Sequence, residues 1–160
     1  MTTWIQKPAN QIVIDGDPLR LEVTIGANAT AAKMLPGRFV IHDADDGDVK
    51  EDAAGKALNV LGQLDVAPDK LESDAYAVGD RAILLTGVYI GKVLLLANEN
   101  VAPGDRLVLA ADGKVAKLAV GAAGATGAVI AVALESSNVA EDTEIAALIN
   151  TAGYHSIAAA

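Results

Sequence analysis

The stretch that decides the fold runs from Ala97 to Leu134 and reads ANENVAPGDRLVLAADGKVAKLAVGAAGATGAVIAVAL. Pro103-Gly104 predicts a tight turn before the apolar run Arg106 to Leu109. Asp112-Gly113 is typical of a two-residue type I′ hairpin, in which both central residues need positive φ. Further strands are expected over Lys114 to Val120 and in AVIAVAL. These features predict an antiparallel meander rather than a nucleotide-binding βαβ unit.

The composition limits the fold and the partners. The chain has 160 residues and is 52% hydrophobic but only 3% aromatic, so its core must be built from Ala, Val, Leu and Ile. Such a core suits closely apposed strands in one domain. The net charge of −9 repels phosphate backbones and argues against a nucleic-acid partner. Because Cys is absent, there is no disulfide framework, thiolate nucleophile or thiolate metal site.

We divide the chain into an N-terminal arm (1–11), a single β-rich domain (12–150) and a flexible C-terminal tail (151–160). The arm is polar and irregular apart from Trp4 and Ile5. It is either a frayed terminus or a segment that orders on a partner, with Trp4 as its anchor. Its sequence does not have the pattern of a signal peptide, and no apolar run approaches the ~20 residues that span a bilayer. We therefore expect a soluble chain made in the cytoplasm, with no membrane partner.

The first half of the domain predicts further strands. Residues 12–25 are expected to form a hairpin that turns at Asp15-Gly16, with one face in solvent. The EDAAGKALNVLGQL segment, residues 51–64, has apolar residues at helical spacing and predicts at most one short helix, which its two glycines weaken. RAILLT and VYIGKVLLL follow as two apolar strands of the interior, and EIAALI predicts a last strand near the C-terminus.

Short motifs recur along the chain at offsets of 66 to 70 residues. Ala27-Asn28 corresponds to Ala97-Asn98, and Asp46-Gly47 corresponds to Asp112-Gly113. Between these pairs, PGRFVI corresponds to the PGDRLVL segment. One explanation is a diverged internal repeat. The other is chance, because short turn motifs are common in β-proteins.

No arrangement of catalytic residues emerges from the motifs, and we expect a protein without catalytic residues or cofactor. The histidines are His42 and His155, and none of the four serines stands in a G-x-S-x-G elbow. GVYIGKV resembles a phosphate loop but is one residue short and has Val93 where Ser or Thr must bind the metal. GAAGATG lacks the G-x-G-x-x-G spacing, and no helical stretch follows it.

The most concentrated polar cluster is HDADDGD, from His42 to Asp48, whose four carboxylates could supply the oxygen ligands that calcium prefers. Its spacing misses the EF-hand pattern, which has glycine at position six and a distal Glu. We therefore interpret it as a solvated acidic turn between two strands, with no metal site. Paired carboxylates for glycoside hydrolysis are also available, but no aromatic platform accompanies them.

Three segments carry a family resemblance: VGDRAILLTGV, then GKVLLLANENVAPGDRLVLAADGKV, then ATGAVIAVALESSNVAEDTEIAALI. Their order resembles the small capsid decoration proteins of tailed phages and tailed archaeal viruses. The matching elements are a strand that ends in Gly-Val, a "vaPGD" turn, a "DG" hairpin, an "iGvALE" strand and a last "vrVLI"-like strand. They fall at Gly87-Val88, Val101 to Asp105, Asp112-Gly113, Thr126 to Glu135 and Glu144 to Ile149. The resemblance covers about half of the chain, and the longer N-terminal half departs from the pattern.

This resemblance implies a small antiparallel β-barrel or β-tulip protein on the capsid surface of a virion, assembled in the host cytoplasm. Such a protein binds the major capsid protein, is commonly a homotrimer and catalyses nothing. Trp4 and Ile5 are the capsid-interaction candidates, since an extended arm can add as a strand to a sheet edge. The alternatives are a barrel-sandwich, biotinyl-like binding domain and a hydrolase with an unrecognised site. Against the first, Lys114 and Lys117 flank the wrong turn for a modifiable lysine.

Overall fold

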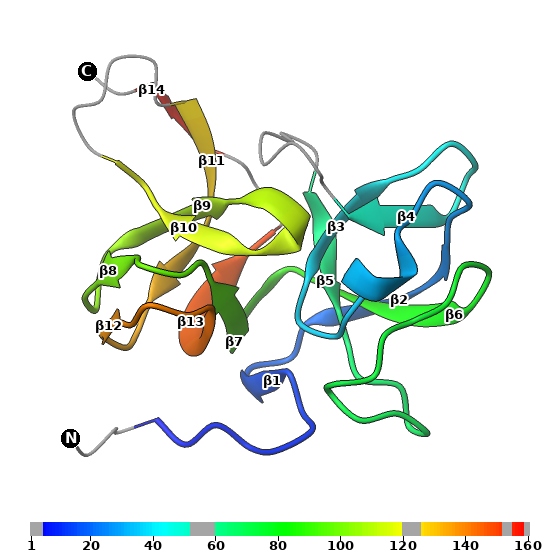
Figure 1. Cartoon of the computed structure of the whole chain (residues 1–160), viewed down its shortest axis with the longest axis horizontal. Coiled ribbons are helices and arrows are strands. Elements are labelled where there is room, and N and C mark those ends of the chain that lie inside the picture. Colours follow the sequence, from blue (N-terminus) through cyan, green and yellow to red (C-terminus); the bar gives the residue numbers. More distant parts are fainter. Residues whose placement is uncertain (1–4, 52–59, 120–125, 152–154, 159–160) are drawn as a thin grey trace.

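The protein consists of two neighbouring five-stranded β-barrels in a computed structural model that describes residues 5–51, 60–119, 126–151 and 155–158 (Figure 1). The first barrel contains β2 (Leu19–Ile25), β3 (Phe39–His42), β4 (Asp48–Glu51), β5 (Val60–Leu64) and β6 (Arg81–Thr86). The second contains β7 (Val88–Leu95), β9 (Arg106–Leu109), β10 (Val115–Lys117), β11 (Thr126–Ala133) and β13 (Thr143–Asn150). The predicted mainly β barrel fold is confirmed.

The remaining elements are short and lie at the margins of the barrels. The strands are β1 (Val13–Asp15), β8 (Asn100–Val101), β12 (Ser137–Asn138) and β14 (His155–Ala158); the 3-10 turns are η1 (Ala31–Lys33) and η2 (Ala111–Gly113). β8 pairs with β12, and β14 pairs with the beginning of β11. The segment expected as a flexible tail therefore contains a strand, because the backbone of β11 offers it an unpaired edge.

The two barrels use one pairing scheme. In each, the first strand pairs parallel with the third and antiparallel with the fifth, as β2 does with β4 and β6, and β7 with β10 and β13. The second strand pairs with the third and the fourth, and the fourth pairs with the fifth. The recurring sequence motifs occupy equivalent places, since PGRFVI leads into β3 and PGDRLVL leads into β9. A duplication would produce such a correspondence.

The turn at Asp112-Gly113 has the positive φ at both residues that the sequence predicts, but the loop is the three-residue η2 turn rather than a two-residue hairpin, because Leu109 pairs with Val115. Asp112 has φ 61° and Gly113 has φ 73°, and the amide of Ala110 donates to the carbonyl of Lys114 at 2.8 Å. The turn joins β9 to β10 in an antiparallel pair. The predicted order of the three strands is wrong, however, because β11 pairs with β9 and not with β10. β9 is thus the middle strand of the three.

Two expectations for the first half are also wrong. β1 and β2 do not form a hairpin: β1 pairs with β7 of the second barrel, and β2 pairs with β4 and β6. Pairing with β7 places Ile12 and Val13 in the common core, which a local hairpin would leave half in solvent. Within the expected short helix, Val60–Leu64 forms strand β5 instead, while residues 52–59 lie outside the described residues.

The hydrophobic core joins the barrels. One cluster of buried side chains fills the first barrel and includes the almost fully buried Ile25, Met34 and Leu64. A second cluster fills the other barrel and extends into the first through Phe39, Val60 and Leu85. Figure 1 shows the reason, since β3 and β5 are the strands of the first barrel that face the second. Burial of this shared surface holds the two barrels together.

Polar contacts cross between the barrels beside this core. The guanidinium of Arg38 donates to the carbonyl of Asp112 at 2.9 Å, and the ammonium of Lys33 lies 2.8 Å from the Asp112 carboxylate. Where the chain passes from β6 to β7, the hydroxyl of Thr151 accepts from the amide of Gly87 and contacts the hydroxyl of Thr86 at 3.0 Å. These contacts fix the relative position of the barrels more specifically than apolar packing does.

Candidate functional site

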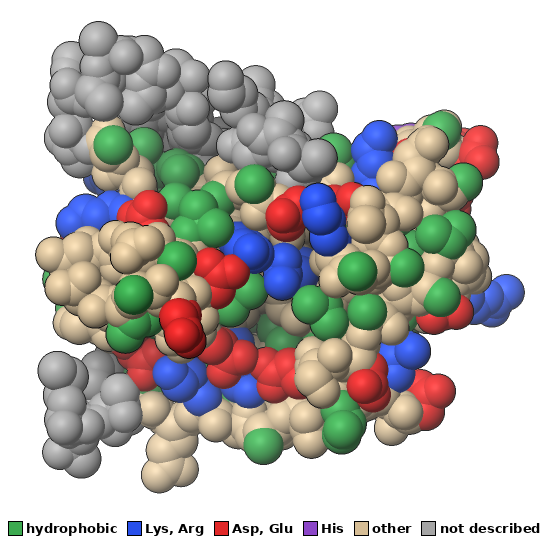
Figure 2. All heavy atoms as spheres, viewed as in Figure 1, with side chains coloured by type: hydrophobic (Ala, Val, Ile, Leu, Met, Phe, Trp, Pro, Cys, Tyr) green, Lys and Arg blue, Asp and Glu red, His purple; other side chains and the backbone are tan. Residues whose placement is uncertain are grey.

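A cleft of about 430 Å³ receives side chains from both halves of the chain. Its lining residues come from the segments before β1 and β3, from the connection between β5 and β6, and from β7 and β13; they are Ile12, Leu35, Pro36, Gly37, Arg38, Glu72, Ser73, Lys92, Val93, Leu94 and Glu144. Figure 2 shows acidic and basic side chains gathered across the middle of the viewed face, between the barrels. The charged group of this cleft is the candidate site.

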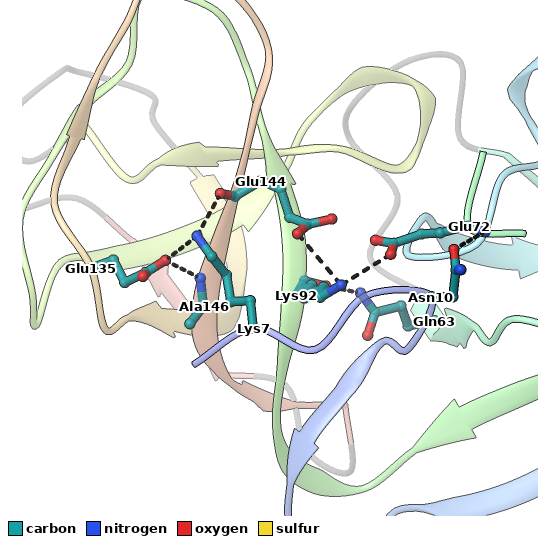
Figure 3. A network of polar contacts seen from close by, with 8 residues as sticks. All are labelled: Lys7, Asn10, Gln63, Glu72, Lys92, Glu135, Glu144 and Ala146. Atoms are coloured by element: carbon teal, nitrogen blue, oxygen red, sulfur yellow. Dashed lines mark hydrogen bonds and ion pairs between the residues drawn. The ribbon is translucent and has the colours of Figure 1, made fainter. Parts of the chain in front are cut away.

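Lys92 lies at the centre of the group, in the middle of β7, with its side chain only 4% exposed. Its ammonium is 3.0 Å from the carboxylate of Glu72 and 3.7 Å from that of Glu144 (Figure 3). A buried ammonium is costly unless it is paired, so the two carboxylates are what allow Lys92 to occupy this position. We call these three side chains the Glu72–Lys92–Glu144 cluster.

The two carboxyl groups of the cluster differ in their acidity. Burial and the neighbouring Glu72 raise the pKa of Glu144 to about 7. Burial also acts to raise the pKa of Glu72, but the neighbouring Glu144 and the hydrogen bond from the ammonium of Lys92 outweigh it, and the pKa of Glu72 is lowered. Glu72 is therefore the more acidic of the two carboxyl groups and the stronger partner of Lys92.

The N-terminal segment runs beside the cluster, and polar contacts of Lys7 and Asn10 hold it there. The ammonium of Lys7 lies 2.9 Å from the carboxylate of Glu135 and donates to the backbone carbonyl of Glu144 at 3.3 Å. The side-chain oxygen of Asn10 accepts from the amide of Glu72 at 3.3 Å. Ile5 is 7% exposed, so this residue, expected on a free arm, is covered in the folded chain.

The other arm residue singled out from the sequence, Trp4, lies outside the described residues. The carboxylate of Glu135 is buried and only partly paired. The residue is 6% exposed, and its Oε1 has no hydrogen-bond partner among the described residues. Its Oε2 accepts from both Lys7 and the amide of Ala146. The N-terminal segment therefore covers a buried carboxylate as well as an apolar surface.

The geometry of the cluster does not suit glycoside hydrolysis. Glycosidases keep their two carboxyl groups about 5 Å or more apart, so that a sugar or a water can lie between them. The ammonium of Lys92 lies between Glu72 and Glu144, at 3.0 and 3.7 Å from their carboxylates, and occupies the place that a sugar or a water would need. This arrangement binds segments of the two barrels to each other through one buried ammonium.

The acidic loop HDADDGD is only partly a solvated turn. Ala44 to Gly47 are exposed, but the side chain of Asp43 is 2% exposed. It accepts from the amide and the carboxamide of Asn28 at 3.0 and 2.9 Å, and the ammonium of Lys50 lies 3.4 Å away. Asp43 thus ties the start of the β2–β3 connection to β3 and β4. Among the described residues, no three or more His, Cys, Asp or Glu side chains form a group that could hold a metal ion.

The remaining residues considered from the sequence are dispersed. His42 is exposed at the end of β3, and His155 lies in β14. Ser73 lines the cleft, next to Glu72. Lys114 and Lys117 form ion pairs with Asp142 and Asp105, at 2.7 and 2.8 Å, whereas a lysine that receives a cofactor must present a free amine.

None of the three residues of the cluster was predicted as a site residue from the sequence. Glu72, Lys92 and Glu144 are separated by 20 and 52 positions, and no motif joins them. One signal was present: Lys92 is the only charged residue of VYIGKVLLL, an otherwise apolar strand. A lysine in such a strand needs a buried partner, which a sequence cannot identify.

The fold and the site define a mainly β, double-barrel protein with a polar cluster between its halves. No protein-family model matches the chain, and no curated protein matches it. The chain is similar to a solved structure of the head fiber gp8.5 N base in bacteriophage phi29, with 14% identity and a TM-score of 0.49. The similarity covers 83% of this chain and 96% of that chain. Within the described residues, no helix is long and apolar enough to cross a membrane.

Proposed function

We propose that this chain is a non-enzymatic structural protein of a virion, which binds the major capsid protein from outside the shell and stabilises it. The supporting observation is where the decoration-protein pattern falls. Its "vaPGD" turn leads into β9, its "DG" hairpin joins β9 to β10, and its last two segments coincide with β11 and β13. The pattern thus follows the framework of one complete barrel, which is more than a set of scattered turns.

The exposed surface of the strands supports a binding role. Leu19 and Leu21 of β2 are 68% and 50% exposed, and Val88 of β7 is 56% exposed. Leu148 of β13, opposite Ile90 of β7, is 40% exposed. Apolar side chains on regular strands offer rigid contact surface to a neighbouring protein, either a capsid subunit or another copy of this chain.

The N-terminal segment is the second element of the proposal, with Trp4 and Ile5 as its capsid contacts. Ile5 is buried against the domain. The N-terminal segment must therefore detach from the domain before Ile5 can contact a capsid subunit. The cost of that opening lowers the apparent affinity of a single arm. A homotrimer would compensate by presenting three arms together, since linked weak contacts raise avidity.

The test is co-sedimentation with undecorated capsid shells, together with the mass of the protein in solution. The wild-type chain should sediment with shells and raise their thermal stability. Deletion of residues 2–9 should abolish binding while the mass stays that of a trimer. Leu21→Asp should weaken shell binding or self-association, whereas Leu71→Asp, in the exposed β5–β6 connection, is the matched control and should do neither. Full binding by the deletion variant would remove the arm from the proposal, and no binding by the wild type would reject the function.

A further inference from the structure

The first half of strand β2 has an open edge. β2 pairs with β6 from Leu19 to Thr24, but on its other side it pairs with β4 only at Thr24 and Ile25. Among the described residues, the stretch from Leu19 to Val23 therefore has no neighbouring strand on the β4 side. Leu19 to Glu22 are also exposed, in contrast to the rest of the strand. β2 thus presents a sheet edge to which another strand can add.

The backbone groups that face this open edge belong to Arg20 and Glu22. The amides of Thr24 and Gly26 donate to carbonyls on the β4 side, and the amide of Ile25, between them, donates at 2.9 Å to the carbonyl that precedes β6. Because successive backbone groups of a strand alternate in direction, the N–H and C=O groups of Arg20 and Glu22 also turn to the β4 side. These two residues would therefore bond to an added strand.

One antiparallel register suits a second copy of the same strand. With Leu21 opposite Leu21 of the second copy, Arg20 lies opposite Glu22 and Glu22 opposite Arg20. Each of these pairs then exchanges both of its backbone hydrogen bonds and sets opposite charges side by side. Sliding one strand by two positions, the next shift that keeps these backbone groups opposed, sets Arg20 against Arg20 or Glu22 against Glu22. It also requires the backbone of Pro18, which has no N–H, or of Thr24, whose amide already donates to the β4 side.

The same register covers the exposed apolar side chains of the edge. Leu19, Leu21 and Val23 lie on one face of β2, and the two leucines are 68% and 50% exposed. Pairing about Leu21 places each leucine of this row against an apolar residue of the second copy, since Leu19 comes to lie opposite Val23. The apolar row of one strand therefore continues into the other, and such cross-strand pairs stabilise a sheet.

The charged side chains of the edge are held only weakly within the chain. The guanidinium of Arg20 lies 3.5 Å from the carboxylate of Asp17, and that of Arg81 lies 3.1 Å from the carboxylate of Glu22. All four side chains are about half exposed or more, and ion pairs of this kind contribute little to stability. Arg20 and Glu22 can therefore turn to a second copy at little cost.

We propose that β2 is a self-association edge: two copies of this chain pair through Leu19 to Val23 about a two-fold axis at Leu21, with Arg20 of each copy against Glu22 of the other. Because the paired stretch is short, the contact is weak in dilute solution and is favoured where copies are crowded together. The pairing does not depend on the proposed virion function. In a trimeric chain it joins one trimer to the next, because a two-fold contact cannot close a ring of three.

The test is disulfide cross-linking of the purified chain, which has no cysteine of its own. Directly opposed residues at a position without backbone hydrogen bonds have Cα atoms about 4.5 Å apart, within the reach of a disulfide. Leu21→Cys should therefore form covalent dimers under mild oxidation. Leu19→Cys is the control, because it is the more exposed position but does not meet its own copy in the proposed register. It should cross-link at least about tenfold more slowly.

Charge reversal in the Leu21→Cys background tests the register. Arg20→Glu or Glu22→Arg alone sets like charges opposite each other and should slow cross-linking at least about tenfold. An equimolar mixture of the two should recover the rate as a mixed dimer, which also shows that both variants are folded. Glu141→Arg, exposed before β13, is the matched control and should leave the rate unchanged. Equal or faster cross-linking of Leu19→Cys, reversals without effect, or a mixture that does not recover would overturn the β2 pairing.

Discussion

The phenol of Tyr89 donates a hydrogen bond of 2.8 Å to the side-chain carbonyl of Gln63 at the buried interface between the two barrels. Tyr89 stands on β7 and Gln63 on β5, and they are 2% and 0% exposed. The carboxamide nitrogen of Gln63 donates to the carbonyls of Gly37 and Lys92, so the glutamine connects three segments. Burial raises the pKa of Tyr89 far above its usual value, and the phenol therefore remains a donor throughout the neutral range.

Removing this hydrogen bond should destabilise the fold. Tyr89→Phe leaves the carbonyl of Gln63 buried without a partner, which costs about 1–3 kcal/mol of unfolding free energy in urea melts. The double variant Tyr89→Phe/Gln63→Leu removes both polar partners from the pair. If it is as unstable as the sum of the two single variants, the two residues are not coupled as the structure indicates.

Gly113 should tolerate substitution less well than Gly47, its equivalent in the first barrel. Both have positive φ, at 73° and 82°, so an alanine at either position costs ~1–2 kcal/mol for the left-handed conformation. A Cβ on Gly113 would also meet the backbone of Phe39, whereas one on Gly47 meets nothing within 4 Å. Gly113→Ala should therefore be less stable than Gly47→Ala by roughly a further 1–3 kcal/mol. Equal melting temperatures would contradict the contact between the η2 turn and β3.

Asp43 should contribute to stability in a pH-dependent way. The hydrogen bond from Asn28 lowers its pKa below the usual 3.8. Its contribution is therefore present above about pH 4 and is lost as the pH falls through the lower value of the folded state. Asp43→Asn should lower the melting temperature at pH 7 and make the acid unfolding profile shallower. The control is Asp45→Asn in the exposed part of the loop, which should leave both unchanged.

Calcium should not stabilise the acidic loop specifically. The carboxylate of Asp43 is occupied by Asn28 and Lys50, which leaves only the exposed part of HDADDGD for an ion. Thermal melts with calcium chloride and with sodium chloride at equal ionic strength should coincide. A rise specific to calcium would reveal binding to the folded chain, because such binding stabilises it by mass action.

Removing the ion pair between Lys7 and Glu135 should loosen the N-terminal segment without unfolding the domain. Lys7 is the basic residue of the segment, and its ammonium pairs with a carboxylate that is 5% exposed. Lys7→Ala should speed proteolysis within residues 5–11, since the pair helps to hold this segment to the second barrel. Gln6→Ala, on an exposed neighbour, provides the comparison. Unchanged cleavage would show that burial of Ile5 and the Asn10–Glu72 hydrogen bond hold the segment without the ion pair.

By itself the sequence determined the local structure of this protein. The dihedral angles of a turn depend on a few adjacent residues, so Asp112-Gly113 could be recognised as a hairpin turn, and apolar runs such as RAILLT and EIAALI could be recognised as strands. Only the tertiary structure decided which strands pair, because pairing depends on surfaces supplied by distant segments. That is why β1 pairs with β7, why β9 lies between β10 and β11, and why Val60–Leu64 is a strand. The Glu72–Lys92–Glu144 cluster could not be predicted for the same reason. Its three residues are brought together and buried only when both barrels are assembled.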